Sequence, residues 1–170
     1  LMFYPDRAGN ENNHVEKFGA SDVLDLNWVQ LMNAYSCTEC GRCTNECPAN
    51  QTGKKLSPRK IMMDTRDRLE KVSLNISNNK GKFVDDGDRL LDNYISKEEL
   101  WACTSCNACV EACPINIDPL SIIMDMRQYL IMEESSAHPD LNNMMNNIEN
   151  NGAPWPYNQL DRELWVQETK

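Results

Sequence analysis

All eight cysteines of the chain belong to two copies of one pattern, C-x-x-C-x-x-C-x-x-x-C-P. The first copy holds Cys37, Cys40, Cys43 and Cys47 before Pro48, and the second holds Cys103, Cys106, Cys109 and Cys113 before Pro114. Three thiolates spaced in this way lie on one tight loop and can bind three corners of an iron-sulfur cube. The pattern is typical of two [4Fe-4S] clusters and leaves no cysteine for another purpose.

The fourth corner of each cube must come from outside its own tight loop. In the two-cluster arrangement, the cysteine before the proline ligates the other cluster. We therefore assign one cluster to Cys37, Cys40, Cys43 and Cys113, and the other to Cys103, Cys106, Cys109 and Cys47. Proline disfavours the helical region for the residue before it, so each fourth cysteine is expected to be extended and to point away from its own loop.

Two other uses of cysteine fit the pattern poorly. A structural zinc site needs four ligands, commonly two C-x-x-C pairs, and has no use for the third and fourth cysteines at this spacing. A disulfide framework is typical of small secreted domains and requires neither the spacing nor the prolines.

The chain repeats itself beyond the cysteines. The two cysteine runs are offset by 66 residues, and this offset also matches Tyr35 with Trp101. Further on the offset becomes 61, where residues 57–69 align with residues 118–130 and Arg66 with Arg127. The sequence therefore predicts one unit of helix, cluster loop and helix, used twice.

Local signals predict where these helices begin. Ser57 and Asp118 are N-cap candidates, each followed by a proline suited to the first helical position. Ser96 and Glu99 form a capping box. The first helix is expected to use one apolar face as a wall that keeps water from the clusters; that face comprises Leu24, Trp28, Leu31, Met32 and Tyr35. Arg66 and Arg127 are expected to pair with Asp64, Asp125 or neighbouring acids on a solvated face, or else to point toward a cluster or partner.

No alternating strand pattern survives in these segments, so the fold class is mainly α, a helical ferredoxin-like domain with extended N- and C-terminal arms. We expect a linker or arm at 1–20, the dicluster domain at 21–134, and a helix with a partner-docking arm at 135–170. Residues 72–95 form a polar excursion with one short helix near 89–94. After Pro139 another helix is expected to end at Gly152, and Pro154 and Pro156 should hold the following aromatic segment extended.

Charge and hydropathy indicate what kind of partner the chain binds and where in the cell it works. The formal charge is -9, and each oxidised cluster with its thiolates adds roughly -2, which argues against nucleic acid and favours a protein partner with a basic rim. There is no run of eighteen apolar residues and no signal-peptide pattern. Because the chain opens on Leu1, we expect a fragment of a longer protein. Reduced cysteines and oxygen-sensitive clusters indicate the cytoplasmic side.

The chain resembles the small iron-sulfur subunit of heterodisulfide-reductase-type complexes. The resemblance covers residues 22–134 and is carried by CTECGRCTNECPA (37–49), TGKKLSPRKIMMDTRD (52–67), LWACTSCNACVEACPI (100–115) and DPL (118–120). In related proteins such a domain follows a membrane-embedded, haem-binding segment. The family's Cys-Cys-Gly motifs, which build the substrate-side cluster, are absent from this sequence.

The resemblance implies an electron-transfer subunit of a membrane-linked oxidoreductase, held at the cytoplasmic side of the inner membrane by its parent protein or a partner. It would pass single electrons between a soluble partner, either an electron-transfer flavoprotein or a Cys-Cys-Gly-bearing protein, and the quinone pool. The other hypothesis is a free, diffusing dicluster carrier, or an iron-sulfur domain with a regulatory or purely structural role. We expect no substrate-converting site, because His14 and His138 are the only histidines and the isolated glycines form no dinucleotide loop.

Overall fold

The computed structural model describes residues 17–168, apart from the side chain of Gln159. It divides into two compact units, with the boundary between Glu133 and Glu134. His14 and most of the expected N-terminal arm, residues 1–16, lie outside the described residues. The last part of that arm packs against α8 (Pro119–Met132): Ala20 is buried, and its N–H donates to the Asp125 carbonyl at 3.0 Å. The domain limits given above stay predictions.

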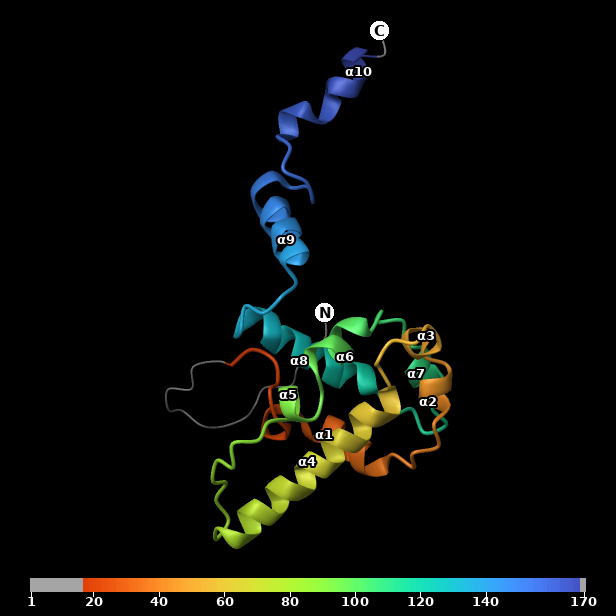
Figure 1. The fold of residues 1–170 in the computed structure, drawn as a ribbon, viewed down its shortest axis with the longest axis vertical. Helices are drawn as coiled ribbons and strands as arrows, with labels where there is room; N and C mark the ends of the chain where they lie inside the picture. The colour runs from red at the N-terminus through yellow and green to blue at the C-terminus, as the bar shows by residue number, and fades with distance from the viewer. Residues whose placement is uncertain (1–16, 169–170) are drawn as a thin grey trace. The chain divides into compact units, whose positions relative to one another are not determined.

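The first unit is built from helices, as the sequence predicts (Figure 1). No β-strand occurs among residues 17–168, although an isolated bridge joins Leu91 and Ile95. The first unit also contains η1 (Val23–Asp25), α1 (Trp28–Ser36), α2 (Arg42–Asn45), α3 (Pro48–Gln51), α4 (Pro58–Asn78), α5 (Leu90–Asn93), α6 (Lys97–Ala102) and α7 (Ala108–Glu111).

The internal repeat is visible in the helices. Helices α2 and α7 start 66 residues apart and contact each other. Helices α4 and α8 start 61 residues apart, at the predicted prolines, and the side chains of Ser57 and Asp118 cap them by accepting the N–H of Lys60 and Ser121. The five-residue difference between the two offsets falls after the first cysteine run, in the stretch that contains α3.

The two cluster loops also share a backbone conformation. Glu39 and Ser105 stand at matching positions with φ of 58° and 57°, and Gly41 and Asn107 match at 82° and 62°. Left-handed residues at these points reverse the chain within the spacing of the cysteines, just before α2 and α7 begin. The predicted doubling of helix, loop and helix is therefore present in three dimensions.

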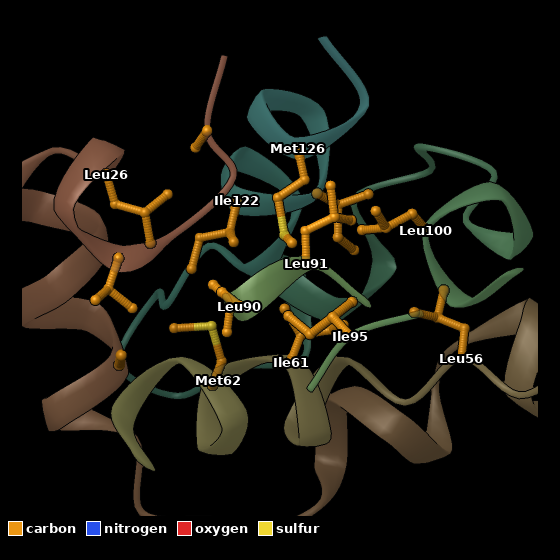
Figure 2. Packing of buried hydrophobic residues seen from close by; sticks show 14 of the residues in the cluster. Leu26, Leu56, Ile61, Met62, Leu90, Leu91, Ile95, Leu100, Ile122 and Met126 are labelled. Carbon is orange, nitrogen blue, oxygen red and sulfur yellow. The ribbon is translucent and has the colours of Figure 1, made fainter. Parts of the chain in front are cut away.

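The hydrophobic core lies between α4 and α8 and is completed by the segment around α5 and α6 (Figure 2). Ile61 and Met62 face the core from α4, and Ile122 and Met126 from α8. Leu91 is fully buried between them, because the chain at α5 departs from helical geometry and turns inward. This core fixes the two long helices that follow the two cluster loops.

The apolar face predicted for the first helix is wrong for four of its five residues, since only Leu31 packs against the core. Trp28 is 69% exposed and Met32 is 52% exposed, whereas Gln30 and Ala34 are buried. Helix α1 packs on α4 and α8. The Gln30 side chain is satisfied there, because its amide donates to Asp125 at 2.7 Å and its oxygen accepts the N–H of the N-cap Asn27 at 2.9 Å. The buried face of α1 is therefore the one that carries the small Ala34 and the hydrogen-bonded amide of Gln30.

Helix α4 extends beyond residue 72, where the sequence predicted that the polar excursion would begin. It continues to Asn78, because Val72 is still buried against the core and Ile76 packs beside it. The following loop returns along the helix: the Asn75 side chain donates to the Val84 carbonyl at 2.8 Å and accepts the Val84 N–H at 3.0 Å. The predicted short helix within the excursion is confirmed as α5.

Arg68 of α4 is the largest fully buried side chain of the first unit. Its guanidinium donates to Asp22 at 2.8 Å, to Asp86 at 2.6 Å and to the Asp88 carbonyl at 2.6 Å. Hydrogen bonding to Asp22 and Asp86 raises the pKa of Arg68 above its already high value, so the charge is permanent. The pairing joins the chain before α1 to the excursion after α4.

The second unit contains α9 (Pro139–Asn151), η2 (Gln159–Glu163) and α10 (Leu164–Glu168). The predicted helix after Pro139 is confirmed, with the His138 side chain as its N-cap and Gly152 closing it at φ 66°. The aromatic segment after Gly152 is irregular in its first half and helical in its second half. Residues around Pro154 and Pro156 have no regular helix, but η2 and α10 are helical where an extended arm was expected, since the prolines restrict only their own surroundings.

Substituting Arg68→Met should lower the free energy of unfolding by about 3 kcal/mol, because two carboxylates and a carbonyl lose a buried charged donor. The measurement is urea unfolding of the iron-loaded protein. Arg89→Met is the matched control: Arg89 and Asp92 form an exposed pair, whose loss should cost less than about 1 kcal/mol. Equal destabilisation by the two variants would contradict a structural role for Arg68.

Candidate iron-sulfur centre

The cysteines gather around two hollows in the first unit. The first hollow is lined by Cys37, Cys40, Cys43, Cys109 and Cys113. The second hollow is lined by Cys47, Cys103, Cys106 and Cys109. They have volumes of about 410 and 330 Å³, counting the space open to solvent. Each hollow therefore receives three cysteines from one loop and the fourth cysteine of the other loop, and Cys109 borders both.

The local backbone explains this exchange. Cys47 and Cys113 stand directly before a proline, and Cys47 has the extended φ of -74° and ψ of 117°. The Cys47 side chain is buried at the second hollow, away from the loop that carries Cys37, Cys40 and Cys43. Helices α2 and α7, which contact each other, bring the two loops together. The crossed ligation remains a prediction, and this arrangement provides the geometry it needs.

Apolar side chains form the remaining walls. Met62, Ile115 and Ile117 line the first hollow. Leu56, Leu120 and Ile123 line the second hollow. These walls come from α4, α8 and the stretches before them, whereas α1 contributes none of the residues predicted for this purpose. Thiolates on an apolar floor are the donor set that an iron-sulfur cube requires, so the residues present fit two [4Fe-4S] clusters.

Burial makes some thiols hard to ionise in the absence of metal. Burial and the neighbouring thiolate of Cys103 raise the pKa of Cys109 to about 12. Burial, together with Cys37 and Cys40, also raises the pKa of Cys43. The N–H of Ala108 at the start of α7 lowers the pKa of the exposed Cys106 instead. Binding of iron must displace protons from the buried thiols, so assembly of the site is coupled to proton release.

Neither repeated arginine pairs with Asp64 or Asp125, but both reach a cluster loop, which is the other outcome expected from the sequence. Arg66 forms an ion pair of 2.5 Å with Glu39 in the first cluster loop. Arg127 donates instead to the carbonyls of Leu100 and Cys103 at the end of α6, and its guanidinium lies 5.1 Å from the centre of the Trp101 ring.

The sequence named a cluster as one possible target of these two arginines, but it did not identify the partners that they meet in the cluster loops. The alignment of Arg66 with Arg127 was the available signal, because a charged residue kept at the same place in both halves suggests a shared neighbour. That neighbour is the loop carrying the cysteines in each half. The sequence does not reveal that one arginine meets a carboxylate and the other meets carbonyl groups.

Two further properties hold within residues 17–168. No group of three or more His, Cys, Asp or Glu side chains there is arranged around a single metal ion. None of the helices in the same range has the length and apolar character that a bilayer crossing requires.

Comparisons with known proteins agree with this geometry. Residues 36–117 match the family described as the 4Fe-4S dicluster domain. The chain is 33% identical over 181 residues to the probable iron-sulfur-binding oxidoreductase FadF of Bacillus subtilis, an alignment covering 90% of this chain and 26% of the relative. It is 29% identical over 171 residues to the EtfAB:quinone oxidoreductase of Syntrophomonas wolfei, covering 90% of this chain and 24% of the relative.

A third relative has a different setting. The chain is 30% identical over 125 residues to a CoB–CoM heterodisulfide reductase iron-sulfur subunit of Methanocaldococcus jannaschii, covering 74% of this chain and 55% of the relative. This chain therefore spans about a quarter of the first two relatives and about half of the third. The resemblance to heterodisulfide reductase subunits that the sequence predicted is confirmed.

Removal of iron should abolish fixed tertiary structure in the first unit, because the thiols and apolar walls of both hollows would then lack the group that joins them. The purified protein should contain about eight iron atoms per chain. After chelation under reducing conditions its near-UV circular dichroism should disappear, and reloading with iron and sulfide should restore it. Zinc in place of iron, or a native near-UV spectrum without metal, would contradict this.

Proposed function

We propose that this chain, whose residues 36–117 match the 4Fe-4S dicluster domain family, is the electron-transfer part of a membrane-linked oxidoreductase. The observation that carries the proposal is the exchange of cysteines between two hollows that share Cys109 as a border. Two adjoining cluster sites on one small unit provide an entry and an exit for electrons.

Each [4Fe-4S] cluster, when bound, takes up or releases one electron. The chain supplies the surroundings. Met62 and Ile117 cover the first hollow and Leu56 and Ile123 the second, which excludes water from the inner side of each site. Cys40 and Cys106 are exposed on the outer sides, where a partner could approach. Contact between α2 and α7 keeps the two sites next to each other.

The proposed ligands are the crossed sets: Cys37, Cys40, Cys43 and Cys113 for one cluster, and Cys103, Cys106, Cys109 and Cys47 for the other. The lining of the two hollows supports both sets. The border position of Cys109 agrees with a short path between the sites. Crossing also has a mechanical role, because each cluster then ties both halves of the repeat together.

Single substitutions can test the crossing. Cys47→Ser should remove the same EPR signal as Cys106→Ser, and Cys113→Ser the same signal as Cys40→Ser, because each pair shares one cluster. Iron content should fall toward about half in each variant. The opposite grouping, in which Cys47→Ser matches Cys40→Ser, would show uncrossed ligation.

The electron donor and acceptor are proposed from the relatives. One relative is named EtfAB:quinone oxidoreductase, and another is named as an iron-sulfur subunit of CoB–CoM heterodisulfide reductase. We propose a soluble partner on one side, either an electron-transfer flavoprotein or a Cys-Cys-Gly-bearing iron-sulfur subunit. On the other side we propose a quinone-reactive membrane segment or subunit, which binds haem in the related architecture. Because quinones reside in the bilayer, the chain would work at the cytoplasmic face of the membrane.

A free dicluster carrier is the second candidate. The net charge of -9 favours it in one respect, since an acidic surface keeps a diffusing carrier soluble. The exposed aromatic side chains of the second unit favour the complex, because aromatics are common anchors of protein interfaces. Purification from the native host distinguishes the two: a reducible monomer with no retained partner would support the carrier.

The second unit is the proposed docking element for the Cys-Cys-Gly-bearing partner. Trp155, Tyr157 and Trp165 are exposed by 58%, 67% and 67%. They follow the helix end at Gly152, so a truncation there removes all three and leaves α9 complete. Tyr and Trp are enriched among the residues that anchor interfaces, whereas Lys, Glu and Asp are depleted there.

Truncation after Gly152 should leave iron content and thermal stability unchanged but abolish copurification with the partner and electron flow to quinone. A full-length variant with Trp155→Ala, Tyr157→Ala and Trp165→Ala should reproduce both losses. Loss of iron or unfolding in the truncated protein would mean that the segment packs on its own domain instead.

A further inference from the structure

The two halves of the repeat differ in charge where they contact the clusters. Arg66 in α4 and Arg127 in α8 occupy matching positions, 61 residues apart. Glu39 and Ser105 occupy matching positions in the two cluster loops, with nearly equal φ angles of 58° and 57°. Each arginine reaches the loop of its own half. The backbone positions are equivalent in the two halves, but Arg66 meets a glutamate and Arg127 meets a serine.

In the first half, the positive charge is cancelled locally. The Arg66 Nη2 lies 2.5 Å from Glu39 Oε1, and Asp67 is also within 3.8 Å of the same guanidinium. Glu39 itself lines the first hollow. The group bound there therefore meets an ion pair, whose field falls off faster than that of a single charge.

In the second half, the hydrogen-bond and ring partners described for Arg127 are neutral, and its one charged neighbour is the cluster-lining thiol of Cys103. The neutral partners are the carbonyls of Leu100 and Cys103, the Ser105 hydroxyl at 3.4 Å and the Trp101 ring. The carbonyl of Cys103, a residue that lines the second hollow, accepts from Nη2 at 2.5 Å. The Ser105 N–H also lies 3.4 Å from Cys103 Sγ, as a donor toward sulfur. The second hollow thus borders a half-buried positive charge that no carboxylate among these partners cancels.

The positive charge of Arg59 would favour reduction of the first cluster rather than the second. Arg59 lines the first hollow and could favour electrons there. Its side chain is exposed, however, and solvent screens exposed charges much more than half-buried ones. Arg127 is only partly exposed and is fixed by three hydrogen bonds to carbonyl oxygens, so its field acts from a constant position.

We infer that Arg127 raises the reduction potential of the cluster held in the second hollow above that of the cluster held in the first. The inference rests on the proposed electron-transfer function and adds a direction to it. A positive charge favours the reduced, more negative state of a cluster, and hydrogen bonds to sulfur act in the same sense. One electron leaving the first cluster oxidises it and reduces the second. When the pair holds a single electron, that electron therefore resides mainly on the second cluster.

The expected size follows from Coulomb's law. A unit charge at ~10 Å, with an effective dielectric constant of ~20, changes a one-electron equilibrium roughly tenfold. A tenfold change corresponds to about 59 mV for a one-electron couple. Such a shift is large enough to set the order of two clusters of the same type.

The decisive variants exchange the loop residues and leave both arginines in place. Ser105→Glu gives the second loop the carboxylate of the first, and Glu39→Ser removes it from the first loop. Both positions are on the surface and share one backbone conformation, in which each half already accommodates the residue to be introduced. EPR-monitored redox titration of the iron-loaded protein with soluble mediators measures both potentials.

Ser105→Glu should lower the higher of the two potentials by an amount equal to about a tenfold change in the equilibrium constant of reduction. Glu39→Ser should raise the lower potential by a similar amount. The double variant should narrow the gap between the two potentials, because Asp67 still lies within 3.8 Å of Arg66. Arg127→Gln should act like Ser105→Glu, and Arg59→Gln should change neither potential by more than about twofold, because the Arg59 charge is screened. The inference is overturned if Ser105→Glu shifts the lower potential, or shifts neither.

The same titration separates this inference from the function on which it rests. Two reversible one-electron signals with about eight iron atoms per chain support the cluster function whatever their order. Unchanged potentials in the loop variants would then reject only the role of Arg127. Absence of reversible signals in the unmodified protein would reject the proposed function itself.

Discussion

The buried guanidinium of Arg68 is the constraint on which the rest of the first unit depends. Asp22 accepts from Arg68 and also from the N–H of Leu90, so one carboxylate fixes both the entry to α1 and the chain that leads into α5. Asp86 and the Asp88 carbonyl complete the cage around the charge. A loop of acidic and glycine residues is thereby ordered by a single cation. Because α4 carries that cation, the helix behind the first cluster loop also determines where the second half of the repeat begins.

The sequence predicted well those features that depend on neighbouring residues. Cysteine spacing, the caps at Ser57 and Asp118, the Ser96 capping box and the end at Gly152 are all local signals, and the structure contains each of them. Features decided by distant residues were not predicted. The apolar residues of α1 formed a convincing stripe, but α4 and α8 offer that helix a place that suits Ala34 and a partner for Gln30. The contacts of Arg68 and Arg127 likewise join segments that no local pattern relates.

Doubling a unit gives two sites of nearly equal geometry, and equal sites have no preferred direction for an electron. Small differences in side chains can then set the order without disturbing the fold. The contrast between Glu39 and Ser105 is of this kind, since both residues hold the same left-handed turn. The stretch containing α3, which has no helical counterpart among residues 114–118, is a second departure from symmetry. Both departures lie next to the cysteines, and the shared core of α4 and α8 is left intact.

The outward face of α1 has a consequence for handling the isolated chain. Trp28, Met32 and Tyr35 lie one turn apart along the helix, and all three are more than half exposed to water. Apolar groups presented in this way attract one another, and the net charge of -9 opposes that attraction by mutual repulsion between molecules. Added salt weakens the repulsion and leaves the attraction in place. Colloidal stability of the chain should therefore be greatest at low ionic strength, and self-association should increase as salt is raised.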